Sequence, residues 1–253
     1  MLALDVGNTH ITCAVIEEEE VLLIRRVVTE TCLNTGTFFD HLDLKGRSLP
    51  SEIVLSSVRG PVRELIAQEC KRQLGTAPFV VNNDTPMGIA NLYATKETLG
   101  TDRLVDAAAC YHLHTKGKRP GIVIDMGTAT TIDYITEKGE FLGGAIAPGL
   151  VSAYRGLLAF APELPEVGIS KVESPIGTTT KDCIRIGVIA GHAAMAQALS
   201  SMMARAGGGD PLVVYTGGLA EVVEAWMPGE YIRDEHLTLK GLSIIYRINM
   251  KSC

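Results

Sequence analysis

A chain of 253 residues, 46% of them hydrophobic, can form one large globular domain or two small ones. Its net charge of −6 argues against a nucleic-acid surface as the main partner, because such surfaces are basic. Aromatic residues make up only 5%, so stacking on bases or sugars is not expected to dominate binding. The chain shows no apolar run expected to span a bilayer and no basic or secretory segment at its start, which predicts a soluble, cytoplasmic protein without a membrane partner.

The cysteines are dispersed along the chain without a C-x-x-C pair, which favours buried reduced thiols over disulfides or zinc ligands. They are Cys13, Cys32, Cys70, Cys110, Cys183 and Cys253. An acidic protein that binds a polyphosphate must supply positive potential locally. Backbone amides, a few basic side chains and a divalent cation can do so.

The first predicted elements, over residues 2–29, are three strands in an antiparallel meander, with a turn at residues 17–20. The first strand ends at Asp5 and is followed by Gly7 and Asn8. Glycine lets backbone N–H groups approach a phosphate closely, and a carboxylate at a strand end can hold a cation or its water shell. This turn is therefore a candidate phosphate site.

The next segments predict a short helix over 34–42, a strand over 52–57, a helix from Pro61 and a strand over 78–81. The first lobe is thus a meander followed by a β-α-β unit. Residues 82–99 look irregular, and a loop of this length in a compact domain is commonly functional. The loop leads through Gly100–Arg103 into a helix over 104–114, where Asp102 is either a carboxylate favoured by the helix dipole or a functional group.

Residues 121–134 repeat the sequence pattern found at the N-terminus. A buried strand ends at Asp125, and a turn follows at Gly127 and Thr128. Asp5 and Asp125 lie 120 residues apart, about the length of one small domain. Each turn alone is also compatible with an ordinary hairpin, since turns are rich in Asp, Gly and Thr. The pair at domain spacing indicates two similarly folded lobes that face a shared nucleotide.

The predicted domains of the chain are residues 1–110 and 111–253. The second of them continues with further strands and helices. A third strand over 140–146 leads through glycine-rich 143–149 into a helix, and proline-rich 160–176 is predicted to be a loop. The remaining elements are a long helix from 180 to about 205, a strand over 211–215, Gly217–Gly218, a helix over 219–226 and a final helix over 237–248. The fold class predicted is α/β.

Several motifs in order resemble those of type III pantothenate kinases, and the resemblance covers residues 2 to about 246. They are Asp5-Val6-Gly7-Asn8-Thr9-His10, Gly100-Thr101-Asp102-Arg103, Asp125-Met126-Gly127-Thr128-Ala129-Thr130-Thr131, Gly143-Gly144-x-Ile146-x-Pro148-Gly149 and Thr216-Gly217-Gly218. The resemblance implies duplicated ribonuclease H-like, actin-like lobes of the acetate and sugar kinase/Hsp70/actin superfamily. It also implies ATP-dependent phosphorylation of pantothenate to 4′-phosphopantothenate, the first step towards coenzyme A.

The resemblance also assigns expected roles. Asp102 is the expected base, Asp125 the contact for a monovalent cation (potassium or ammonium), and Asp5 lies near Mg²⁺. The expected ATP and phosphate residues are Asp5, Val6, Gly7, Asn8, Thr9, His10, Ile11, Thr12, Gly127 and Thr128. The expected pantothenate residues are Tyr93, Gly100, Thr101, Asp102, Arg103 and Thr180. A homodimer is expected, with Thr180 supplied by the partner chain.

Two other functions are compatible with the same fold. One is a non-catalytic accessory or regulatory relative, in which erosion of Asp102 or of the glycine turns would be expected; both are intact. The other is a kinase or phosphatase of the superfamily that acts on another small molecule. Tyr93 and Gly100–Arg103 distinguish pantothenate from that alternative, and a coupled assay of ADP release tests it.

Overall fold

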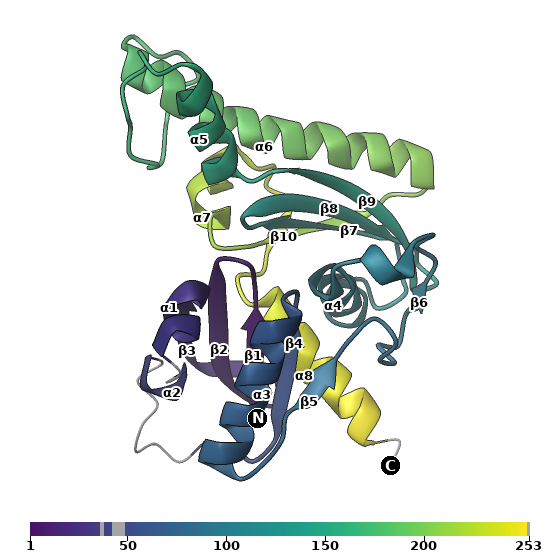
Figure 1. The fold of residues 1–253 in the computed structure, drawn as a ribbon. Helices are drawn as coiled ribbons and strands as arrows, with labels where there is room; N and C mark the ends of the chain where they lie inside the picture. Colours follow the sequence, from purple (N-terminus) through teal and green to yellow (C-terminus); the bar gives the residue numbers. More distant parts are fainter. Residues whose placement is uncertain (36–37, 42–48, 252–253) are drawn as a thin grey trace. The chain divides into compact units, whose positions relative to one another are not determined.

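The computed structural model describes residues 1–35, 38–41 and 49–251. The chain divides into two compact units (Figure 1), of which unit 1 is Met1–Leu113 with His236–Cys253 and unit 2 is His114–Glu235. The division therefore differs from the expected 1–110 and 111–253 mainly at the C-terminus, where residues 236–253 return to unit 1.

Unit 1 contains a five-stranded sheet in the order β3-β2-β1-β4-β5. The strands β1, β2 and β3 are antiparallel neighbours, whereas β4 and β5 continue the sheet in parallel to β1. The strands of this sheet are β1 (Leu2–Val6), β2 (His10–Glu17), β3 (Glu20–Val28), β4 (Ile53–Ser57) and β5 (Phe79–Val81), and the short strand β6 (Ala90–Asn91) lies outside it. The helices are α1 (Thr29–Thr35), α2 (Phe38–His41), α3 (Gly60–Leu74), the 3₁₀ turn η1 (Lys96–Thr98), α4 (Thr101–Ala109), the π-helical turn η2 (Cys110–Thr115) and α8 (Leu237–Met250).

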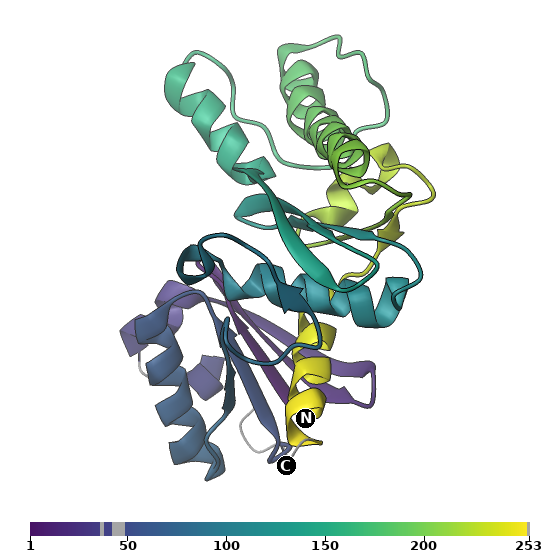
Figure 2. The same cartoon turned by 90° about the vertical axis from the view of Figure 1, so that its right-hand side faces the viewer.

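The sheet of unit 1 is covered on both faces, as Figure 2 shows with α3 in blue and α8 in yellow. Leu2 and Leu4 pack with Ile66 of α3 in one core cluster. Because side chains alternate along a strand, Ala3 and Asp5 point to the opposite face, against which α8 packs. Helix α8 also packs closely on α4: a Cβ on Gly241 would lie only 2.7 Å from the Val105 carbonyl oxygen.

Unit 2 repeats this architecture, with its own strands in the order β11-β10-β7-β8-β9. Here too the meander is antiparallel and the last two strands are parallel to the first. The strands are β7 (Gly121–Met126), β8 (Ala129–Ile135), β9 (Glu140–Pro148), β10 (Leu212–Thr216) and β11 (Ile232–Arg233). The helices are α5 (Leu150–Phe160), α6 (Thr180–Gly207), α7 (Ala220–Val223) and the 3₁₀ turn η3 (Glu224–Trp226).

The common strand order confirms the predicted fold class, α/β with duplicated ribonuclease H-like lobes. Strands β1 and β7 are equivalent, and each is flanked by one antiparallel and one parallel neighbour. The core of unit 2 packs β7, β8 and β10 against α6 and α7. Asp5 and Asp125 therefore occupy equivalent strands.

The local elements follow the sequence prediction closely, with one shift after β3. The helix expected over 34–42 is replaced by α1, which begins at Thr29, and by α2 at Phe38–His41. Residues 36–37 and 42 of the expected helix lie outside the described part of the chain. The earlier start places the buried Thr29 beside the first turn, where it contributes to the site.

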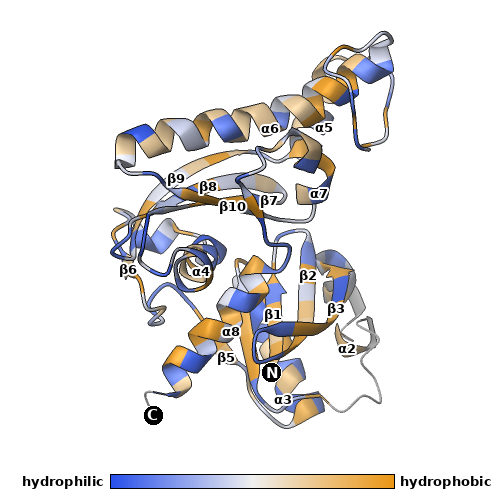
Figure 3. Cartoon of the chain, turned by 180° about the vertical axis from the view of Figure 1, so that it is seen from behind, coloured by the Kyte–Doolittle hydropathy of each residue, from blue (hydrophilic) through white to orange (hydrophobic). Residues whose placement is uncertain are grey.

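Helix α6 corrects the expectation that no apolar segment is long enough for a membrane. By length and composition alone, this one helix of the described chain could cross a bilayer. Figure 3 shows hydrophilic as well as hydrophobic segments along α6, and Ile189, Ala193 and Ala196 pack into the core of unit 2. One side of α6 is therefore covered by the core of unit 2, although only 28% of its most apolar stretch is buried.

Candidate active site

The first candidate phosphate turn, Gly7–Thr9, joins β1 to β2. The Gly7 N–H donates to the His10 carbonyl at 2.9 Å, and Asn8 and Thr9 are exposed. Thr29 braces the turn, because its N–H donates to the Thr9 carbonyl at 2.9 Å and its hydroxyl to the Gly7 carbonyl at 3.0 Å. Thr29 thus holds the turn in place, and the turn exposes Asn8 and Thr9 to solvent.

The residues on either side of this turn differ in how deeply their side chains are buried. Val6 and Ile11 are fully buried, so only their backbone is available to a ligand. His10 has Arg26 of β3 as a neighbour, with 3.5 Å between Arg26 Nη2 and His10 Nδ1. Burial, and then the charge of Arg26, lower the pKa of His10. Arg26 places a positive charge beside His10 at the edge of this turn, and sequence patterns did not single it out.

Asp5 lies between hydroxyl side chains on the neighbouring strands. Thr12 of β2 and Ser56 of β4 are its register partners, and register partners place their side chains on the same face. The Ser56 hydroxyl is fully buried and has no hydrogen-bond partner among the described residues. A carboxylate with hydroxyls on both sides suits Mg²⁺, which is usually held by one or two carboxylates, waters and substrate phosphates.

The candidate acceptor segment, residues 82–103, is organised around Asn83. Its side-chain amide donates to the carbonyls of Lys96 at 2.9 Å and Leu99 at 2.7 Å, and its amide oxygen accepts from the Thr101 hydroxyl at 2.8 Å. Asn83 thereby fixes the end of the irregular loop to the start of α4. Sequence reasoning noted the loop but not this residue, whose partners lie 13 to 18 positions away.

Asp102 stands in the first turn of α4 and is partly buried. Its Oδ1 accepts from the Arg103 N–H at 2.9 Å. A Cβ on Gly100 would overlap this carboxylate oxygen, so glycine is required for the carboxylate to sit there. Burial raises the pKa of Asp102, while the Arg103 N–H and the Arg103 charge act in the opposite direction. A carboxylate with a raised pKa is a better proton acceptor, as a general base requires.

Arg103 and Tyr93 form a second part of the acceptor segment. The Arg103 guanidinium carbon lies 5.5 Å from the centre of the Tyr93 ring, a cation–π distance. Arg103 is only 6% exposed, so its charge is held in a fixed position rather than free in solvent. Unit 1 thus brings Tyr93 into contact with Arg103, next to Gly100, Thr101 and Asp102, and the role of these residues as an acceptor pocket stays a prediction.

The second candidate phosphate turn, Gly127–Thr128, joins β7 to β8 in unit 2. The Gly127 N–H donates to the Ala129 carbonyl at 3.1 Å, which closes the turn. Asp125 lies on the face of the sheet opposite α6, with Thr131 of β8 and Thr216 of β10 as its register partners. Asp125 therefore lies between two hydroxyl side chains, as Asp5 does, and oxygen ligands of this kind suit a hard cation.

Two glycines allow the backbone around this turn to pack closely. A Cβ on Gly217 would lie 2.6 Å from Asp125 Oδ1, and its φ of 100° disfavours other residues. A Cβ on Gly149 would overlap the carbonyl oxygens of Gly127 and Thr128. The glycine-rich motifs singled out at 143–149 and 216–218 therefore converge on the second turn. Ser152 of α5 adds a bond of 2.7 Å from its hydroxyl to the Thr128 carbonyl.

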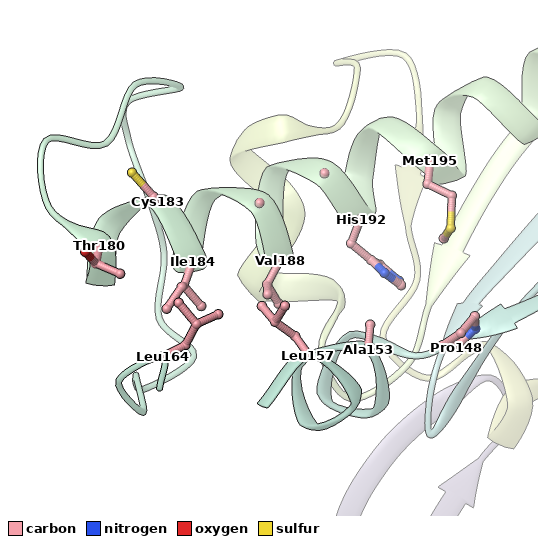
Figure 4. A pocket seen from close by; sticks show the side chains of 12 residues that line it. Pro148, Ala153, Leu157, Leu164, Thr180, Cys183, Ile184, Val188, His192 and Met195 are labelled. Carbon is pink, nitrogen blue, oxygen red and sulfur yellow. The ribbon is translucent and has the colours of Figure 1, made fainter. Parts of the chain in front are cut away.

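Thr180, the last expected acceptor residue, begins α6 and is exposed. It lines a cavity of about 600 Å³ between α5 and α6 within unit 2, shown in Figure 4. Thr179 caps the helix by accepting from the Asp182 N–H at 3.2 Å. The Thr180 hydroxyl is not needed for the cap and stays available to a ligand.

The described part of the chain contains no preformed metal site, and most of its cysteines are buried. No group of three or more His, Cys, Asp or Glu side chains there could hold a metal by itself. A cation at Asp5 or Asp125 would therefore share its coordination with substrate phosphates, and the flanking hydroxyls fit that arrangement. Four cysteines are buried and free, and burial raises the pKa of Cys13, Cys70 and Cys110 to about 12. Cys183 differs in being exposed, and Cys253 lies outside the described residues.

Solved structures share this fold at low sequence identity. A Campylobacter jejuni protein assigned to a Baf family of transcriptional activators has a TM-score of 0.63 at 20% identity, over 99% of this chain and 100% of that one. The activator of 2-hydroxyisocaproyl-CoA dehydratase from Clostridium difficile, solved with bound ADPNP, has a TM-score of 0.53 at 13% identity, over 100% of this chain and 98% of that one. Two units of one topology, each with a carboxylate turn on its first strand, define the class of proteins with the acetate and sugar kinase/Hsp70/actin fold.

Sequence relatives give the family within this class. A sequence model of the type III pantothenate kinase family matches residues 1–202. The type III pantothenate kinase of Syntrophus aciditrophicus is 34% identical, over 98% of this chain and 99% of that protein. That of Halalkalibacterium halodurans is 32% identical, over 99% of this chain and 100% of that protein. The chain belongs to the type III pantothenate kinase family.

Proposed function

We propose that this protein transfers the γ-phosphoryl group of ATP to the hydroxyl of pantothenate, giving 4′-phosphopantothenate for coenzyme A synthesis. The observation that carries the proposal is membership of the type III pantothenate kinase family over nearly the whole chain. The preserved Asp5 and Asp125 turns and the preorganised Asp102 support catalysis rather than a purely accessory role. Phosphoryl transfer depends on positioning and charge neutralisation, and both turns offer such groups.

Asp102 is the proposed general base. Its carboxylate would accept the proton of the pantothenate hydroxyl as that oxygen attacks the γ-phosphorus, and the ADP oxygen would leave with the electron pair. The raised pKa of Asp102 favours this proton transfer. Arg103, held against Tyr93, would bind the pantothenate carboxylate as a fixed cation.

The two turns are the proposed phosphate sites. The backbone groups of Gly7–Thr9 and Gly127–Thr128 would donate to phosphate oxygens. Asp5, with Thr12 and Ser56 beside it, would hold Mg²⁺, and Asp125, with Thr131 and Thr216, would hold potassium or ammonium. These cations would neutralise phosphate charge, which the net negative protein cannot do alone.

The proposed assembly is a cytoplasmic homodimer in which Thr180 of one chain completes the pantothenate pocket of its partner. Exposed apolar side chains support an interface on unit 2: Leu157, which lines the same cavity as Thr180, and also Phe160 and Ile176. Light scattering at the protein concentration of the assay tests the dimer. An active monomer would contradict it.

A coupled assay of ADP release with purified protein, Mg·ATP and pantothenate tests the function directly. We expect ADP release that depends on pantothenate and forms one equivalent of a phosphomonoester per ADP. Sugars and acetate serve as alternative acceptors. Faster turnover of one of them would assign the protein to another activity of the superfamily, and ATP binding without any turnover would favour an accessory role.

A further inference from the structure

One buried pair of polar side chains joins α6 to the strand that follows the second phosphate turn. The Thr130 hydroxyl of β8 and His192 Nε2 of α6 are 2.9 Å apart. Thr130 is completely buried and His192 is 6% exposed. The two residues lie 62 positions apart, so no local sequence pattern indicates their contact.

The environment makes this bond necessary for Thr130. Its side chain is on the face of β8 that also carries Ile132 and Tyr134, both in the hydrophobic core with Ile189 of α6. A hydroxyl buried among such groups loses its hydrogen bonds to water and needs a partner inside the protein. The histidine ring supplies that partner.

Thr130 is also tied closely to the turn itself. It is the register partner of Met126, so the Thr130–Met126 pair closes the hairpin whose tip is Gly127–Thr128. On its other side Thr130 pairs with Ala147 of β9, two residues before Gly149, whose N–H donates to the Thr128 carbonyl at 3.2 Å. A shift of Thr130 would therefore move the backbone groups of the turn.

His192 is suited to hold Thr130 near neutral pH. Burial lowers the pKa of His192, so its ring is neutral there and makes the bond without carrying a charge into the core. Figure 4 shows the ring extending from α6 towards Pro148 and Ala153, at the inner end of the cavity between α5 and α6. The ring thus occupies a fixed position between α6 and the end of β9.

We propose that His192 is a positioning residue for the second phosphate turn, which it holds in its binding geometry through Thr130. The site that His192 supports is the nucleotide site, so the inference rests on the proposed function for the identity of the ligand. Loss of the His192–Thr130 bond should weaken nucleotide binding more than it lowers the rate of the chemical step.

The test compares His192→Leu, His192→Gln, Thr130→Val and the double variant His192→Leu with Thr130→Val. Affinity for Mg·ATP is measured by calorimetry without pantothenate, and KM and kcat are measured separately. We expect Kd and KM for ATP to rise about five- to tenfold in either single variant, a usual size for one coupled pair. The double variant should bind Mg·ATP no more weakly than the weaker-binding single variant. His192→Gln keeps a hydrogen-bonding group near the Nε2 position, so its Kd should lie within about twofold of the wild-type value.

Ser200→Ala is the matched control on the same helix. Ser200 is 1% exposed and its hydroxyl donates to the Ala196 carbonyl at 2.8 Å, so its loss can lower the melting temperature without reaching the turn. Unchanged Kd in the His192→Leu protein, or equal losses in His192→Leu and His192→Gln, would overturn the positioning role. Failure of wild-type protein to turn over pantothenate while it binds ATP would overturn the proposed function alone, and a wild type that bound no nucleotide would overturn both.

Discussion

At the scale of single residues, the candidate site depends on carboxylates whose surroundings differ. Asp5 and Asp125 each lie one residue before the end of a strand, between flanking hydroxyls, whereas Asp102 lies in the first turn of a helix, partly buried, with a raised pKa. The first two environments favour cations and phosphates, and the third favours proton transfer. The three aspartates should therefore respond differently to the same substitution by asparagine.

Asp102→Asn should lower kcat by about 10²-fold or more, because the amide cannot accept the proton. It should also raise the melting temperature at neutral pH. The folded-state pKa of Asp102 lies above its unfolded value, so the charged carboxylate lowers the stability of the folded protein. This stability penalty is fully present above the folded-state pKa. This penalty fades as the pH falls towards the unfolded value. The measurements are kcat, ATP affinity and thermal unfolding across pH. A near-normal kcat would show that Asp102 is not the base and serves only as a favourable charge at the N-terminus of α4.

Asp125 is expected to make activity depend on a monovalent cation. Potassium or ammonium should support turnover in addition to Mg²⁺, and Asp125→Asn should weaken ATP binding and remove the response to potassium. The response is measured as KM for ATP against potassium concentration at constant ionic strength, with sodium as replacement. Asp5→Asn is the comparison: it should raise the Mg²⁺ requirement but keep the potassium response. Full activity of the wild type in sodium alone would exclude the role proposed for Asp125.

At the scale of elements, sequence patterns predict what depends on neighbours in the chain. The hairpins β1–β2 and β7–β8, with the turns at their tips, follow from short β-prone apolar runs and local glycines. The bonds that hold the site were missed because their partners are distant: 22 positions for Thr29 and Gly7, 24 for Ser152 and Thr128. The glycine-rich stretch at 143–149 was visible in the sequence, but its contact with the second turn was not.

That contact makes Gly149→Ala a sharp test of how the N-terminus of α5 supports the turn. The added methyl group would overlap the carbonyl oxygens of Gly127 and Thr128, so either α5 or the turn must move. We expect a loss of about 1–3 kcal/mol in the free energy of unfolding, as for other overpacked sites, together with weaker ATP binding. Chemical denaturation and calorimetry measure the two effects.

Gly156→Ala is the control for this substitution on the same helix. A Cβ there meets no atom within 4 Å, so the change should leave ATP affinity unaltered and stabilise α5 by up to about 1 kcal/mol through helix propensity. If Gly149→Ala bound ATP as well as Gly156→Ala does, the support of the turn by α5 would be refuted.

At the scale of the whole molecule, the chain crosses between its units twice, after Leu113 and after Glu235. The sequence predicts α8 as a helix, but an amphipathic helix does not indicate which of two similar sheets it will cover. Helix α8 packs on β1 and β4, which begin more than 180 positions earlier in the chain. Unit 1 is therefore discontinuous, and its stability should depend on the C-terminus.

Deletion of residues 236–251 should unfold unit 1. The deletion removes the buried side chains of Leu237, Leu239, Leu242 and Ile245. Each such burial contributes about 1.5–3 kcal/mol, so four contribute roughly 6–12, comparable with the 5–15 kcal/mol that stabilises a typical domain. Limited proteolysis with mass spectrometry should show cleavage throughout 1–113 in the truncated protein and protection of 114–235. The full-length variant Leu242→Ala is the graded control, with an expected loss of about 2–5 kcal/mol but a folded unit 1. Equal protection of 1–113 with and without α8 would show that the first unit folds without its C-terminal helix.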